Sequence, residues 1–130
     1  MNQKNKISSK ETTTRYIFYS RYYAKTIGRI KYPAFVPDKN GETSVFRISN
    51  LDDQQIWDIG ENHVSPYSSR TLLARGDLAA LDIFDEGLEI EADTTNHKLH
   101  ANIVGWPLEL AKIKLHATNL AKKAICHIKP

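Results

Sequence analysis

The segment 97–107 constrains the fold more than any other stretch of this chain. From residue 99 to residue 104, the apolar residues Leu99, Ala101 and Ile103 alternate with His100, Asn102 and Val104. This period of two residues is typical of a strand that buries one face. The alternation ends before Pro107, where the longest helical pattern of the chain begins. The second face of this predicted strand carries His100 and Asn102, two side chains that can both donate and accept hydrogen bonds.

Several other segments show alternation or the aromatic and β-branched composition of strands. They are residues 15–19, 29–35, 44–48, 71–75 and 88–91. A polar turn joins the last of them to the strand at 99–104, so we expect these two strands to form a hairpin.

Three segments are predicted to be helical. The first begins at Asp52, which forms a capping-box pattern with Gln55, and it ends at Gly60. The second covers residues 78–84 and is expected to be capped by Asp77.

The third predicted helix has Pro107 in its first turn and runs to about residue 124. Residues 61–69 are expected to form a loop. This order of segments predicts an α+β fold: a small, mostly antiparallel sheet packed by about three helices, of which the C-terminal helix is longest.

A length of 130 residues fits one domain. Residues 1–14 are polar, so we expect them to be a flexible tail and residues 15–130 to be a single α+β domain. Cys126 is the single cysteine, and no apolar run reaches the roughly 20 residues of a membrane span. Together with an N-terminus that lacks an apolar signal segment, these features predict a cytoplasmic protein that does not contact a membrane.

The net charge of +3 conceals an uneven distribution along the chain. Residues 1–32 hold eight Lys and Arg and one acidic residue, residues 42–93 hold twelve acidic residues and three Arg, and residues 94–130 hold six Lys and one acidic residue. Separate surfaces of each sign would favour an anionic partner. Segments that neutralise each other in space are the alternative, and sequence position does not decide between the two.

Aromatic and basic residues are interleaved near the N-terminus. This mixture is typical of single-stranded nucleic-acid binding, because bases stack on rings while cations hold phosphates. The alternative is that the tyrosines pack in the sheet and the cations are solvated. The predicted nucleic-acid-binding residues are Arg15, Tyr19, Arg21, Tyr22, Tyr23, Lys25, Arg29 and Lys31.

A second candidate site is the polar face of the strand at 99–104. His100 can exchange protons near neutral pH, and Arg47 on a neighbouring strand with the same facing would complete, with Asn102, a site for an anionic or carbonyl oxygen. Arg75 and Asp77 are further candidates. The alternative is that His100 and Asn102 are structural polar residues and that Arg47 pairs with an acidic residue of the middle segment, 42–93.

A metal site is not predicted, and no cofactor is expected. His97 and His100 are three residues apart, so in a strand they point to opposite faces and do not converge on one ion. The sequence also lacks the spacing of a nucleophile elbow or of a known metal motif, so it assigns no definite catalytic residue.

The segments 44–48, 74–78 and 100–107, the last of which contains His-Ala-Asn-Ile-Val-Gly-Trp-Pro, resemble the landmarks of a small family of bacterial proteins without an established activity. The resemblance covers residues 15–125. It implies a bacterial or phage source and a cytoplasmic setting, and it assigns no catalytic residue.

These observations predict a small cytoplasmic binding or accessory protein that acts through a protein or nucleic-acid partner. A bacterial defence or conflict system is one setting for such a protein. The alternative is a small enzyme, or a nucleotide- or anion-binding domain, that uses the face formed by His100, Asn102 and Arg47. The sequence does not predict the oligomeric state.

Overall fold

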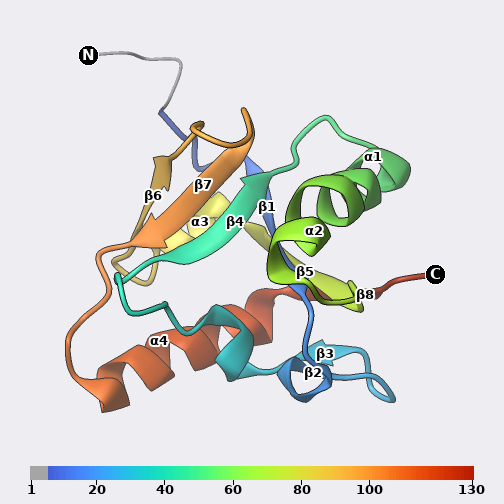
Figure 1. Ribbon diagram of the computed structural model, residues 1–130. Helices are drawn as coiled ribbons and strands as arrows, with labels where there is room; N and C mark the ends of the chain where they lie inside the picture. Colours follow the sequence, from blue (N-terminus) through green and yellow to red (C-terminus); the bar gives the residue numbers. More distant parts are fainter. Residues whose placement is uncertain (1–5) are drawn as a thin grey trace.

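The structure, a computed structural model, describes residues 6–130 (Figure 1). Within these residues, six strands form an antiparallel sheet in the order β6-β7-β4-β1-β5-β8, and β2 pairs with β3 in a separate hairpin. The strands are β1 (Thr12–Ile17), β2 (Tyr23–Ala24), β3 (Arg29–Ile30), β4 (Thr43–Arg47), β5 (Ala74–Ala79), β6 (Glu89–Ala92), β7 (His100–Val104) and β8 (Ile125–Ile128).

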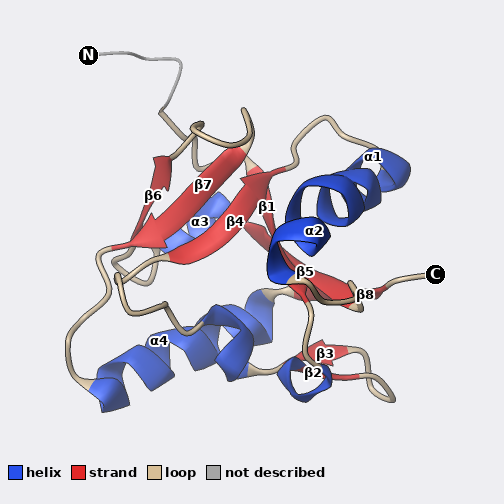
Figure 2. Ribbon diagram, viewed as in Figure 1, coloured by secondary structure: helices blue, strands red, loops and turns tan. Residues whose placement is uncertain are grey.

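Helices lie on both sides of the large sheet (Figure 2). They are α1 (Asp53–Ile59), α2 (Ser65–Ser68), α3 (Ala80–Phe84), α4 (Leu110–Lys123), the π-helical turn η4 (Gly60–Val64) and the short 3-10 turns η2 (Ser20–Tyr22) and η3 (Tyr32–Phe35). Because α1, η4 and α2 follow one another without a break, the helical parts form three main units, and α4 is the longest single helix. The predicted α+β fold is confirmed.

The sheet separates two apolar clusters. One face packs against α3, α4 and η3 around Phe35, Ile83 and Leu120, all of which are fully buried. The other face packs against α1 around Tyr16 and Trp57. The second cluster covers only part of its face, and Figure 1 shows no helix in front of β6, β7 and β4.

The N-terminal prediction is wrong for the residues next to the domain. Residues 1–5 lie outside the described part of the chain, but Ile7 is buried in the core and β1 begins at Thr12 in the middle of the sheet. Thr13 and Thr14 are fully buried, and their hydroxyls donate to the carbonyls of Leu78 and Gly76. Threonine is β-branched and suits a strand, and these cross-strand bonds satisfy its polar group.

The start of α1 agrees with its prediction. The Asp52 side chain accepts from the Gln55 backbone N–H, and the Gln55 side chain accepts from the Asp52 N–H, so the capping box is present. The expected loop at 61–69 is wrong, because the helical path continues from Gly60 through η4 and α2. That path ends at Ser69, whose φ of 57° is left-handed.

Three further boundaries differ from the sequence prediction. Asp77 lies inside β5 and caps no helix, because the strand extends to Ala79 and α3 starts only at residue 80. The expected strand at 29–35 is a two-residue strand followed by η3, since Pro33 fits the first turn of a helix. Residues 125–128 form the edge strand β8, which the sequence analysis missed.

The hairpin that was predicted from 88–91 and 99–104 is present as β6 and β7. Ala101 and Ile103 are fully buried against the core, as the alternation predicts. His100 and Asn102 therefore lie on the opposite face, the one that no helix covers at β7.

Candidate functional site

The polar face of β7 is organised by the register with β4. Phe46 is the register partner of His100, and Ser44 is the register partner of Asn102. Alternate residues of β4 share a face, so Ser44 and Phe46 lie on the same side of the sheet as His100 and Asn102. The rings of Phe46 and His100 confirm this, because their centroids are 5.2 Å apart.

Arg47 does not join this face, and the predicted convergence of Arg47 with His100 and Asn102 is wrong. Arg47 follows Phe46 in β4 and so points to the other side of the sheet. Its guanidinium instead forms a two-pronged ion pair with Glu11, with nitrogen–oxygen distances of 2.7 and 2.9 Å. This is the pairing with an acidic residue that the sequence analysis considered as the alternative, although the partner lies near the N-terminus.

Ser44 occupies the place beside His100 that had been expected for Arg47. The Ser44 Oγ lies 2.8 Å from His100 Nε2, and His100 Nδ1 lies 2.9 Å from the Asp93 carbonyl oxygen. The Asp93 carboxylate is 3.9 Å from the same Nδ1. Hydrogen bonds from the side chain and backbone of Thr95 hold the pKa of the Asp93 carboxyl below its ordinary value.

A small hollow opens next to Ser44 and His100. Its volume is about 180 Å³. It is lined by Ser44, Phe46, His63, Val64, Tyr67, Asn96, His97 and His100. Burial, followed by the neighbouring charges of His63, Lys98 and His100, lowers the pKa of His97, so that imidazole tends to stay neutral beside the hollow.

The histidines around this hollow do not form a metal centre. Within residues 6–130, no group of three or more His, Cys, Asp and Glu side chains is arranged to hold a metal ion. Both ring nitrogens of His100 are engaged, and His97 Nδ1 accepts from the Leu99 backbone N–H.

Arg75 and Asp77 form a separate cluster near the edge strand β8. Arg75 is 1% exposed; its guanidinium donates to Asp77 and Asp53 and stacks 4.7 Å from the ring centroid of Trp57. His127 Nε2 lies 3.3 Å from the Asp77 carboxylate. Because β1 and β4 separate β5 from β7 in the sheet, this cluster is not part of the His100 face.

The predicted nucleic-acid-binding residues divide into buried and accessible ones. Arg15 donates to the carbonyls of Ala34 and Ser44, and Tyr23 is buried, so neither is free to bind a ligand. Lys25 is exposed on the β2–β3 hairpin. The remaining predicted residues line hollows on the side of the molecule where α4, η3 and the hairpin meet. They are Tyr19, Arg21, Tyr22, Arg29 and Lys31.

Three adjoining hollows make up this region, which we call the basic surface. Their volumes are about 360, 470 and 400 Å³; the first two share Arg21, and the last two share Tyr32 and Pro33. The cations that line them are Arg21, Arg29, Lys31, Arg70, Lys114 and Lys122, and the aromatic residues are Phe18, Tyr19, Tyr22 and Tyr32. Among the described residues, no carboxylate lines any of the three hollows.

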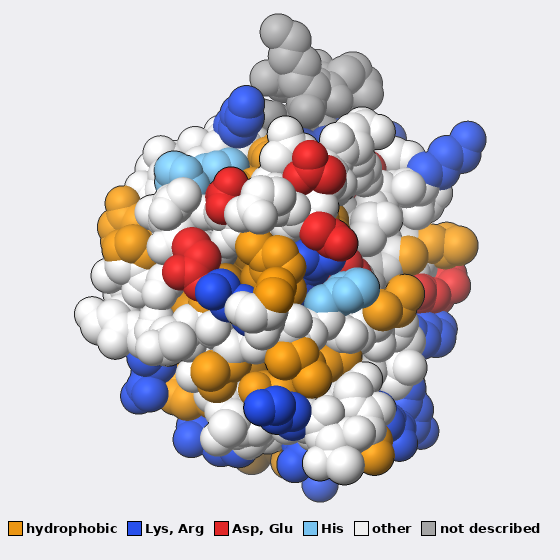
Figure 3. Space-filling model, turned by 90° about the vertical axis from the view of Figure 1, so that its right-hand side faces the viewer, with side chains coloured by type: hydrophobic (Ala, Val, Ile, Leu, Met, Phe, Trp, Pro, Cys, Tyr) orange, Lys and Arg blue, Asp and Glu red, His pale blue; other side chains and the backbone are white. Residues whose placement is uncertain are grey.

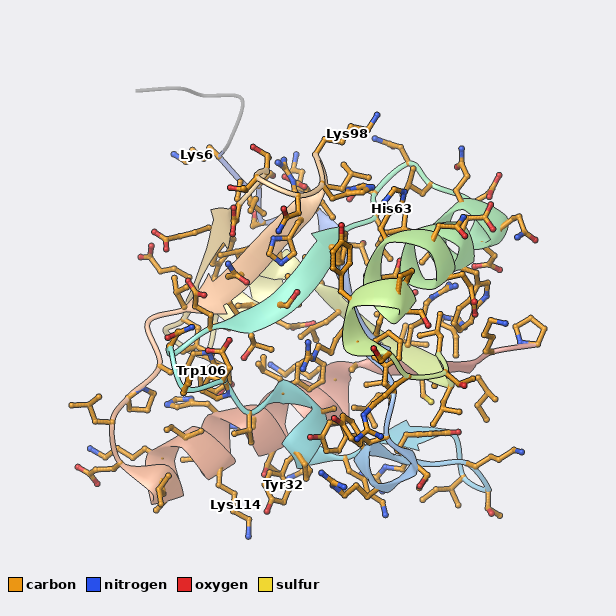
Figure 4. The ribbon with its side chains drawn as sticks, viewed as in Figure 1. Lys6, Tyr32, His63, Lys98, Trp106 and Lys114 are labelled. Carbon is orange, nitrogen blue, oxygen red and sulfur yellow. The ribbon has the colours of Figure 1, made fainter. Side chains whose placement is uncertain are left out.

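Cations and rings are in direct contact on the basic surface. The Arg70 guanidinium lies 4.2 Å from the Tyr19 ring centroid, and Arg21 lies 4.8 Å from the same centroid. The Lys114 ammonium lies 5.0 Å from the Tyr32 ring centroid. Figure 4 shows Tyr32 and Lys114 together below the sheet, whereas Lys6 and Lys98 lie at the opposite end of the molecule.

Comparison with protein-family models, with curated proteins and with solved structures finds no match for this chain. None of the helices in residues 6–130 combines the length and the apolar character that crossing a membrane requires.

The sequence analysis missed several residues of the basic surface. Arg70 lies between α2 and β5 and contacts Tyr19, which is far from it in the sequence, so no local pattern predicts the contact. Lys114, Thr118 and Lys122 are spaced by four residues and so follow one face of α4. That spacing was visible in the sequence, but it could not show that this face lies beside Tyr32.

Proposed function

We propose that this protein binds single-stranded nucleic acid through the basic surface. The observation that carries the proposal is the composition of the three adjoining hollows: each is lined by at least two cations and at least one aromatic ring, and no described carboxylate is present. Cations attract the phosphates, and rings offer flat faces on which unpaired bases stack regardless of sequence.

The distribution of charge on the molecule supports this choice. Figure 3, which views the molecule from the side of α1 and the C-terminus, shows Lys and Arg along the lower edge, with acidic side chains only above them. The lower edge corresponds to α4 and the β2–β3 hairpin in Figure 1. An anionic strand would therefore meet mainly cations along this edge of the face in view.

Accessible rings favour a single strand over a duplex. Tyr32 is 36% exposed, and Tyr19 and Tyr22 are partly exposed. Bases in a duplex are stacked on each other and cannot stack on these rings, whereas unpaired bases can. The setting we propose is a bacterial cytoplasm, as the resemblance of the segment 100–107 implies.

Fluorescence anisotropy with a labelled oligonucleotide of about 12 nucleotides tests the proposal. We expect binding at about 50 mM salt that weakens steeply by about 200 mM. Tyr32→Ala should weaken binding about tenfold through lost stacking, and Lys114→Ala should reduce the slope of log affinity against log salt by about 0.7.

Lys98→Ala is the matched control, because Lys98 is exposed but lies at the opposite end of the molecule (Figure 4). This variant should bind as the wild type does. Absence of binding at low salt, or equal weakening by Lys98→Ala and Lys114→Ala, contradicts the proposal. If an acidic polypeptide binds as tightly as the oligonucleotide and with the same salt dependence, the result indicates a protein partner instead.

A further inference from the structure

We propose that Ser44 and His100 form a nucleophile–base pair that hydrolyses small esters. This activity belongs to the open face of β4 and β7 and does not depend on the basic surface. The sheet register brings the Ser44 hydroxyl to His100, and this hydroxyl supplies a nucleophile, a role different from the oxygen binding that was expected of Arg47. Nucleophile, base and an orienting group within hydrogen-bond reach are the arrangement that covalent hydrolysis needs.

The hydrogen bonds of His100 determine which ring nitrogen carries the proton. The Asp93 carbonyl oxygen, 2.9 Å from Nδ1, can only accept, so Nδ1 must be the protonated nitrogen. In the neutral imidazole, Nε2 is then bare and accepts the hydrogen bond from the Ser44 hydroxyl 2.8 Å away. This is the tautomer in which His100 can remove the Ser44 proton.

The hollow beside Ser44 indicates the size and character of the substrate. Its volume of about 180 Å³ is similar to the roughly 150 Å³ of a protein cavity that holds benzene. Phe46, Val64 and Tyr67 give it apolar walls. A short or aromatic acyl group fits such a space. We propose an ester and not an amide as the substrate, because the alcohol of an ester leaves more readily than the amine of an amide when His100 alone supplies the proton.

The reaction is an ordinary two-step acyl transfer. The Ser44 Oγ attacks the ester carbonyl carbon while its proton passes to His100 Nε2; the carbon–oxygen bond to the alcohol then breaks, and the alcohol leaves with that proton. A water molecule next gives a proton to Nε2 and its oxygen to the acyl carbon. The acid is released as the proton on Nε2 returns to the Ser44 Oγ.

Asn102 is the group we assign to the developing negative charge on the carbonyl oxygen. It does not line the hollow itself, but it is the register partner of Ser44 on the same face, and directly opposite residues of paired strands have Cβ atoms about 5 Å apart. Asn102 is 7% exposed, so water competes little for this amide.

Labelling with a small alkyl fluorophosphonate, followed by mass spectrometry, tests the proposal. We expect one adduct, located on Ser44, with loss of labelling in Ser44→Ala and a rate lower by about 100-fold in His100→Gln. Ser49→Ala is the matched control and should be labelled as the wild type is, because the Ser49 hydroxyl accepts from the Thr12 N–H and touches no imidazole. No adduct, or an adduct that persists in Ser44→Ala, overturns the proposal.

A second variant keeps the test valid if a substitution disturbs folding. Ser44→Cys retains a nucleophile, and its thiol should react with iodoacetamide about tenfold faster than Cys126, whose pKa is raised by burial. Adding His100→Gln should remove this difference. If the thiol introduced by Ser44→Cys reacts no faster than Cys126, then His100 does not activate position 44 and the proposal fails.

Discussion

At Gly60 the backbone of the helical segment passes close to a side chain of β1, Tyr16, and to Leu72, which lies just before β5. A Cβ atom at this position would lie 2.7 Å from Tyr16 Cε1 and 2.7 Å from Leu72 Cδ2. The Tyr16 ring cannot retreat easily, because it is buried and its hydroxyl donates to the Ile56 carbonyl. The residue therefore has to be glycine for reasons of space.

Gly60→Ala should lower the free energy of unfolding by about 1–3 kcal/mol, because the added methyl group overpacks this contact. Urea unfolding followed by circular dichroism measures the change. Asn62→Ala, at an exposed neighbouring position, should change stability by less than about 0.5 kcal/mol. Equal stability of Gly60→Ala and wild type would show that the backbone at the start of η4 does not approach Tyr16 this closely.

The ion pair between Glu11 and Arg47 predicts a pH-dependent contribution to stability. Burial alone raises the pKa of the Glu11 carboxyl, but hydrogen bonds from Arg47 and the Ser8 N–H, together with the Arg47 charge, bring the pKa below its ordinary value of 4.5. A carboxyl whose pKa is lower in the folded state than in the unfolded state stabilises the fold above about pH 4.5, where the carboxyl is ionised. It loses that effect as the pH falls through the folded-state pKa.

Glu11→Gln should therefore reduce the free energy of unfolding by about 1 kcal/mol at neutral pH and by less in acid. Urea unfolding of the variant and the wild type at about pH 7 and about pH 3 measures both differences. A difference that stays constant or grows toward acid pH is incompatible with this pairing.

Single residues show what the sequence could and could not predict about the candidate site. The alternation in 99–104 correctly placed His100 and Asn102 on one face of a strand. It could not show which face of β4 lies beside them, because a shift of one residue in register would place Val45 and Arg47 there instead of Ser44 and Phe46. That register depends on contacts of the whole sheet.

At the scale of elements, the capping box of α1 has a local cause and a local test. Asp52→Ala removes the acceptor for the Gln55 N–H and should lower the free energy of unfolding by about 1 kcal/mol. Asp52→Asn keeps an acceptor oxygen and should be close to wild type. Thermal or urea unfolding of the two variants compares them, and equal losses would mean that the side-chain bond adds nothing.

Elements with strong local patterns were predicted, and elements held by distant contacts were not. The β6–β7 hairpin and the α1 cap follow from alternation and from cap residues. By contrast, Thr12–Ile17 looks polar at its start and becomes a central strand only because β4 and β5 flank it. Residues 125–128 become a strand only because the edge of β5 is free to pair with them.

At the scale of the whole molecule, the fold gathers cations that are far apart in the sequence. Arg21, Arg70 and Lys114 come from three different segments and line adjoining hollows. The uneven charge along the chain left open whether the cations gather on one surface, and the aromatic and basic pattern near the N-terminus predicted a set of residues that is only partly accessible. Arg15 belongs to the basic N-terminal segment and is used inside the fold to bind two carbonyl groups.

Amide chemical-shift mapping of isotope-labelled protein, titrated with a single-stranded oligonucleotide at low salt, tests the central claim most directly. Binding at the basic surface predicts shifts concentrated at 19–22, 29–33 and 114–122, with little change at Lys98 and along β7. Unchanged spectra at low salt, or shifts concentrated at β7 and Lys98, would contradict the claim that the basic surface is the nucleic-acid-binding site.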